Sequence, residues 1–78
     1  MGFTVLKGEL TIGINTDSII FINRSTEKEQ FFINFYMGVD SCAWISFDDK
    51  NLRNKAFETL LRDISNGSVK PSYELGFT

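Results

Sequence analysis

The sequence contains no histidine and a single cysteine, Cys42. Histidine is the commonest general base in enzymes, so its absence removes the usual centre of acid–base catalysis. One thiol cannot form an internal disulfide, and one thiol with scattered carboxylates does not make a zinc site, which needs three or four protein ligands. We therefore expect no catalytic residue, no metal and no cofactor.

Long apolar runs and an excess of basic residues are also missing. No uninterrupted apolar run exceeds four residues, as at residues 19–22. A membrane-spanning helix needs about 20 apolar residues, so we expect none. Residues 1–7 have no basic leader ahead of an apolar segment, and we interpret this as the lack of a signal peptide and expect a cytoplasmic protein. The net charge of −2 disfavours non-specific binding to nucleic acid or to anionic membranes.

What remains is a chain of 78 residues, 42% of them hydrophobic, which is enough for a globular domain. We predict one small domain over residues 1–78, with residues 68–78 as a tail that packs on the sheet or on a partner. A domain this short buries a small fraction of its surface and often needs a disulfide, a metal or a partner chain. Because the first two are excluded, a partner chain is the expected support.

The first two thirds of the chain have the pattern of β-strands. Leu10, Ile12 and Ile14 alternate with smaller or polar residues, which is a period of two. Runs rich in β-branched and aromatic residues follow, and the polar stretch at residues 23–30 reads as a loop. The predicted strands cover residues 10–14, 19–22, 31–37 and 42–47, with residues 3–7 as an extra edge strand or as part of a long first strand.

A helical pattern follows the strands. Apolar residues recur at spacings of three and four, and the helix is predicted over residues 49–65. Asp48 is the expected N-cap, and Gly67 is the expected left-handed residue after the last turn. The predicted fold is therefore α+β, with a four-stranded or five-stranded antiparallel sheet followed by one amphipathic helix. Its apolar stripe consists of Leu52, Ala56, Phe57, Leu60, Leu61 and Ile64.

If each loop contains an even number of residues, the pairing of the strands decides which of the two sheet faces each side chain points to. Pairing Ile14 with Ile19, Ile22 with Phe31, and Met37 with Cys42 makes both faces apolar. One face would hold Ile20, Ile22, Phe31, Ile33, Phe35, Met37, Cys42 and Trp44. The other would hold Leu10, Ile12, Ile14, Ile19, Phe21, Phe32, Asn34, Tyr36, Ala43, Ile45 and Phe47.

One helix covers only one face of a sheet, so the second apolar face needs another cover. A second copy of the chain, a different protein, a ligand or the tail could provide it, or strong curvature could close the sheet into a half-barrel. We expect the helix on the face with Phe35 and Trp44. The expected interface is then on the other face and includes Leu10, Ile12, Phe32, Asn34 and Tyr36.

We therefore predict a non-catalytic protein-interaction or regulatory module that forms a homodimer, of the kind that phages and mobile elements use to occupy a partner's surface. Cys42 is interpreted as a buried structural thiol. The alternative is a protein that binds single-stranded nucleic acid by stacking bases on sheet aromatics. In that case Lys7, Lys50 and Arg53 would contact phosphates.

Overall fold

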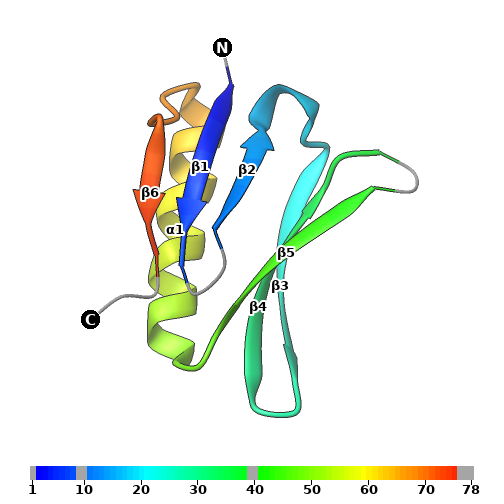
Figure 1. Cartoon of the computed structure of the whole chain (residues 1–78), viewed down its shortest axis with the longest axis vertical. Coiled ribbons are helices and arrows are strands. Elements are labelled where there is room, and N and C mark those ends of the chain that lie inside the picture. The colour runs from blue at the N-terminus through cyan, green and yellow to red at the C-terminus, as the bar shows by residue number, and fades with distance from the viewer. Residues whose placement is uncertain (1, 9–10, 39–40, 76–78) are drawn as a thin grey trace.

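The computed structural model describes residues 2–8, 11–38 and 41–75. The predicted α+β class is confirmed, but the strands form two three-stranded sheets where one sheet was predicted. A short 3-10 helix, η1 (Thr16–Ser18), separates β2 from β3, and the long helix α1 precedes the last strand (Figure 1). The elements are β1 (Phe3–Lys7), β2 (Ile12–Asn15), β3 (Phe21–Glu27), β4 (Gln30–Tyr36), β5 (Cys42–Phe47), α1 (Lys50–Asn66) and β6 (Ser72–Glu74).

The first sheet has the strand order β2–β1–β6. β1 pairs antiparallel with β2 and parallel with β6, so it is the central strand and not an edge strand. The predicted pairing of Ile14 with Ile19 is wrong, because Ile14 lies opposite Thr4 and η1 carries the chain into the other sheet. The strand β6 comes from the region that was described as a tail, and α1 runs behind β1 and β6 in Figure 1.

The second sheet has the order β3–β4–β5 and is antiparallel throughout. The loop predicted over residues 23–30 shrinks to a turn of two residues, Lys28 and Glu29, because Glu27 already pairs with Gln30. Both turn residues have positive φ, 49° and 67°, as a type I′ hairpin turn requires. The polar residues of β3 face solvent along a paired strand, so their polarity does not indicate a loop.

The connection between β4 and β5 changes the predicted faces. Tyr36 pairs with Cys42, which leaves five residues between the paired positions. This odd number shifts the predicted register by one and turns every β5 side chain to the opposite face. Phe35 therefore lies opposite Ala43, and Trp44 lies beside Asn34 on the other face. The expected grouping of Phe35 with Trp44 is wrong for this reason.

The core lies between the inner faces of the two sheets and α1. Ile33 is completely buried, and Leu6, Phe35 and Leu60 are about 1% exposed. Ile12 and Ile14 pack against the core from a second sheet. Much of the apolar surface that was predicted to need a cover is therefore buried within the chain. The buried hydrophobic residues of the core are Leu6, Ile14, Ile33, Phe35, Ile45, Phe47, Ala56, Leu60, Tyr73 and Leu75.

The helix begins one residue later than predicted. Asp49 is the N-cap, and its side chain accepts a hydrogen bond from the backbone N–H of Asn51 at 2.8 Å. Asp48 instead accepts a hydrogen bond from the Gln30 side chain at 3.0 Å. At the other end, the left-handed conformation predicted for Gly67 is confirmed by its φ of 70°.

Two charged residues of α1 are buried, and each binds the helix to one sheet. The Arg53 guanidinium donates to the carbonyl oxygens of Ser25 at 2.8 Å and Phe32 at 3.4 Å, and it lies over the Phe31 ring. Arg53 therefore lies under the β3–β4 hairpin. Burial, with repulsion from Arg24, lowers the pKa of Arg53 from its ordinary value.

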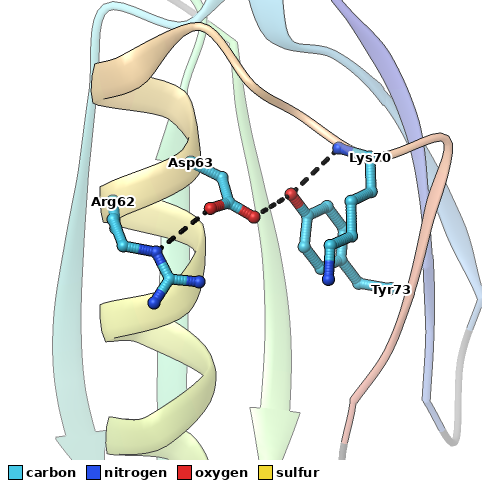
Figure 2. A network of polar contacts seen from close by, with 4 residues as sticks. All are labelled: Arg62, Asp63, Lys70 and Tyr73. Atoms are coloured by element: carbon cyan, nitrogen blue, oxygen red, sulfur yellow. Dashed lines mark hydrogen bonds and ion pairs between the residues drawn. The ribbon is translucent and has the colours of Figure 1, made fainter.

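Asp63 makes the corresponding contact with the first sheet (Figure 2). Its carboxylate accepts a hydrogen bond of 2.6 Å from the Tyr73 hydroxyl and one of 3.2 Å from Arg62. The Tyr73 oxygen also accepts the backbone N–H of Lys70 at 3.0 Å. The hydrogen bond from Tyr73 lowers the pKa of Asp63, against an opposing effect of burial, and Arg62 and Lys70 add to the lowering. Burial and the bond to Asp63 raise the pKa of Tyr73.

Candidate interaction surface

The face of the second sheet that points away from the core carries a regular array of nine side chains, and the pair Glu27 and Gln30 follows it on the same face at the hairpin end. The register places the nine in three rows of three, with one residue from each strand in every row. None of the nine is buried. We call this array the outer grid; its rows are Phe21–Tyr36–Cys42, Asn23–Asn34–Trp44 and Ser25–Phe32–Ser46.

Four of the nine side chains are aromatic, and two of them are strongly exposed. Trp44 is 59% exposed and Phe21 is 50% exposed, whereas Phe32 and Tyr36 are half-buried. The Phe21 and Tyr36 rings are stacked, with their centroids 4.4 Å apart and an interplanar angle of 13°. A group of aromatic side chains on one exposed face is typical of a binding surface, whereas single exposed apolar residues are common on any protein.

Hydrogen bonds hold the middle of the outer grid in one arrangement. The Asn34 amide nitrogen donates to the Asn23 side-chain oxygen and to the Ser25 hydroxyl, both at 2.9 Å. These bonds use both N–H groups of Asn34. Among the described residues, no donor reaches the Asn34 oxygen and no acceptor reaches the Asn23 amide nitrogen. The Asn34 oxygen and the Asn23 amide nitrogen are therefore open to water or to a partner.

The outer grid contains no charged residue. The predicted phosphate-binding cations lie elsewhere: Lys7 is on the first sheet, Lys50 is exposed at the start of α1, and Arg53 is buried. The structure therefore does not bring Lys7, Lys50 and Arg53 to the aromatic residues of the outer grid, as the nucleic-acid hypothesis requires.

The five predicted interface residues divide into three groups. Phe32, Asn34 and Tyr36 lie on the outer grid, at alternate positions of β4. Ile12 belongs to the other sheet and packs against the core. Leu10 lies outside the described residues. Sequence reasoning placed Phe21 on the expected interface face without naming it as an interface residue. It missed Asn23 and Trp44, because no signal in the sequence shows that five residues separate the paired Tyr36 and Cys42.

The lone thiol lies on the same surface. Cys42 is exposed, so its interpretation as a buried structural thiol is wrong. Its side chain points outward because the β5 register is shifted by one residue. No nucleophile–base pair involves it among the described residues, where its only hydrogen bond is a long one of 3.7 Å to the Ala43 carbonyl.

Elsewhere, an open groove of about 380 Å³ lies between α1 and β6, lined by residues that include Lys55, Lys70 and Tyr73. The Tyr73 hydroxyl there is already bonded to Asp63. Residues 2–8, 11–38 and 41–75 contain no group of three metal-ligating side chains. No helix in the same ranges is long and apolar enough to cross a membrane.

Comparison with known proteins adds no functional information. No protein-family model matches the chain, and no curated protein or solved structure matches it either. Functional inference therefore depends on the outer grid itself.

Proposed function

We propose that the chain is a small non-catalytic module that binds another protein surface through the outer grid. The observation that carries this proposal is a contiguous, charge-free array of exposed aromatic and amide side chains on a three-stranded sheet. The cores of protein interfaces are enriched in aromatic residues and depleted of charge, and the array has this composition.

The arrangement of the array favours binding at low entropic cost. Phe21 and Tyr36 are stacked against each other, and Asn34 is held by two hydrogen bonds before any partner arrives. Side chains that are already ordered lose little conformational freedom on association. The backbone beneath them is paired on both sides of β4, so the central residues cannot shift independently.

A nucleic-acid ligand is less compatible with this surface. Single strands are bound by aromatic platforms together with a positively charged groove that follows the phosphates. The outer grid has the aromatic side chains without the cations. We therefore place single-stranded nucleic acid among the outcomes of the test.

A photo-cross-linker at the centre of the surface tests the proposal. Trp44→p-benzoyl-phenylalanine places the reactive group on the outer grid. Phe3→p-benzoyl-phenylalanine is the matched control, because Phe3 is an equally exposed aromatic residue, at 61%, on the other sheet. Irradiation in the cells that produce the chain, followed by protease and nuclease digestion, identifies the class of each adduct.

A protein adduct from position 44 that is absent from position 3 supports the proposal. A nuclease-sensitive adduct from position 44 would favour nucleic acid and overturn it. Equal yields at the two positions, or no adduct at either, would also overturn it, because a dedicated surface must be occupied more often than a control surface.

A further inference from the structure

We infer that the chain binds a phosphate group between Arg24 and Arg53, at the side of the second sheet where the edge strand β3 meets α1. The inference goes beyond the proposed function, because this site is not on the outer grid. Residues directly opposite each other in neighbouring strands share a face, and Arg24 lies opposite the buried Ile33. The Arg24 side chain is therefore on the helix side of β3, and it is exposed there.

Two guanidinium groups meet at a single neutral oxygen atom in this site. The Asn54 side-chain oxygen accepts hydrogen bonds from Arg53 Nε at 2.7 Å and from Arg24 Nη1 at 3.3 Å. The Arg24 guanidinium also lies over the Phe57 ring, 4.9 Å from its centroid, which helps to hold it beside α1. An amide oxygen has no net charge, so it does not neutralise the two positive charges.

No carboxylate of the described chain compensates these charges. Within residues 2–8, 11–38 and 41–75, the only ion pair joins Arg62 to Asp63. Arg53 is only 5% exposed, and charged groups that are this deeply buried are normally paired with an opposite charge. Burial and the repulsion from Arg24 both lower the pKa of Arg53, which agrees with a missing counter-ion. An anion from solution would supply one.

The unused hydrogen-bonding groups of the cluster are donors. A guanidinium has five N–H donors; Arg53 uses three, on Asn54 and on two backbone carbonyls of the hairpin, and Arg24 uses one. Among the described residues, Arg53 Nη2 and the Asn54 amide nitrogen have no acceptor. Neither is a fully enclosed atom, because the Thr4 hydroxyl is the one buried side-chain group without a partner in those ranges. Both nitrogens are therefore open to a ligand from solvent.

The charge of the site selects a phosphate dianion. A carboxylate or a phosphodiester carries one negative charge, whereas a phosphomonoester carries nearly two above neutral pH. Its several oxygens can accept from both arginines and from Asn54 at once, and the planar fork of arginine matches phosphate geometry. The ligand is therefore a phosphate dianion, either as the free inorganic ion or on a phosphorylated side chain.

A proton–nitrogen NMR titration of the whole chain with inorganic phosphate at about pH 8 is the first test, with sodium chloride at equal ionic strength as the control. We expect saturable shifts of the Asn54 side-chain amide and of the Nε–H signals of Arg24 and Arg53. The expected dissociation constant is on the order of 1 mM, because a ligand of so few atoms gains little binding energy.

A second titration with N-acetyl-phosphoserine amide distinguishes the two sources of phosphate. Tighter binding than that of inorganic phosphate would support the site and assign it to a phosphorylated side chain. Weaker binding would support it as a site for the free ion. Failure of both ligands to bind would overturn the inference.

Arg24→Gln is the decisive variant. Arg24 is exposed, and its loss leaves the bonds from Arg53 to the hairpin carbonyls in place, so the fold should persist. The affinity for phosphate should fall at least about tenfold, because one of two charge-assisted contacts is removed. Arg62→Gln is the matched control: Arg62 is an exposed arginine of the same helix that is already paired with Asp63. Its loss should leave the affinity unchanged.

Asn54→Asp gives a second, independent readout. The new carboxylate would stand where both guanidiniums already donate, and it would act as an internal counter-ion. We expect saturable phosphate binding to disappear while the urea midpoint rises. Damage to the fold would lower the midpoint instead, so this variant decides if Arg24→Gln fails to fold by circular dichroism.

Four results would overturn the inference: no saturable shift at the three side chains, the same shifts with chloride, an unchanged affinity in Arg24→Gln, or an equal loss in Arg62→Gln. A midpoint that falls in Asn54→Asp would also contradict it. None of these results depends on an adduct at position 44. The phosphate site and the proposed function can therefore fail separately.

Discussion

The outer face of the β2–β1–β6 sheet carries Lys7, Asn15 and Glu74, whereas the outer grid of the β3–β4–β5 sheet is uncharged and Glu27 lies on that face only beyond it, at the hairpin end. Each sheet also exposes an aromatic residue, Phe3 at 61% and Trp44 at 59%. Their surroundings differ. A Cβ atom at Gly13 would lie 2.8 Å from the Phe3 ring, so that ring covers a glycine. Exposure by itself is therefore not evidence of a binding site; Trp44 is informative because its neighbours on the face, Asn34, Cys42 and Ser46, are all uncharged.

The two sheets are also joined to α1 by different chemistry. The second sheet meets the helix through Arg53, which donates to backbone carbonyls of the hairpin. The first sheet meets it through Asp63, which accepts from the Tyr73 hydroxyl. A domain of this length has a total stability of only about 4–12 kcal/mol, so each connection contributes a considerable share. The two connections can be broken separately.

Phe35→Ala should have the largest effect. Phe35 is about 1% exposed on the inner face of β4, and its removal should lower the free energy of unfolding. The expected loss is about 3–5 kcal/mol, measured by urea unfolding, and the variant could be largely unfolded. The matched change on the outer face, Phe21→Ala, should cost about 1 kcal/mol because only a ring stack is lost. Equal losses would contradict the assignment of inner and outer faces.

Tyr73→Phe should weaken the connection of the first sheet. The change leaves Asp63 without its strongest donor and the Lys70 N–H without its acceptor. We expect a loss of about 1–3 kcal/mol in the free energy of unfolding. Hydrogen exchange should accelerate in β6 and β1 before it does in β4. Tyr36→Phe on the outer grid is the control, and it should leave the unfolding midpoint of the monomer unchanged.

The same variant should alter the pH dependence of stability. Because the pKa of Asp63 is lowered in the folded state, its contribution is present above the ordinary carboxyl pKa and is lost as the pH falls through the folded value. Because the pKa of Tyr73 is raised, its contribution is lost as the pH rises above the ordinary phenol value of about 10. Urea unfolding from pH 3 to pH 11 should show both losses reduced in Tyr73→Phe. Identical pH profiles would exclude the coupling.

Thr4→Val should stabilise the first sheet. The Thr4 hydroxyl is buried and, among the described residues, has no hydrogen-bond partner, whereas the inner face of β4 has no such defect. Valine has nearly the same shape without the hydroxyl, so we expect a gain of about 1 kcal/mol or more. A raised urea midpoint with an unchanged slope would agree. Ser46→Val on the exposed outer grid is the control and should not reproduce the gain.

Glu29→Gly should give the smallest change, in the second sheet. Glu29 has a φ of 67°, a conformation that glycine adopts without steric cost. We expect a gain of about 0.5–1 kcal/mol, since the strain exceeds the entropy that glycine adds. Gly67→Ala is the reverse control, because Gly67 has a φ of 70° and open space around it. A loss there without a gain at Glu29 would show that tertiary contacts, not φ, hold the turn.

Local patterns predicted the local structure well. The spacing of Leu52, Ala56 and Leu60 located the helix, and Gly67 located its end, because periodicity and capping depend on neighbouring residues alone. The prediction of a loop at residues 23–30 failed because polarity was interpreted as irregular structure. Along an exposed edge strand, polar residues are compatible with pairing, and Lys28 and Glu29 adopt positive φ without the glycine or asparagine that usually indicates such a turn.

The chain's own residues determine the α+β class, the position of α1, the lack of histidine, and an aromatic strand at β4 that contains Asn34. Three features came only from the folded structure: the division into two sheets, the outward position of Trp44 and the burial of Arg53 and Asp63. The physical reason is common to all three. Strand partners and register depend on how distant segments meet and on the parity of a loop, and no local pattern encodes either.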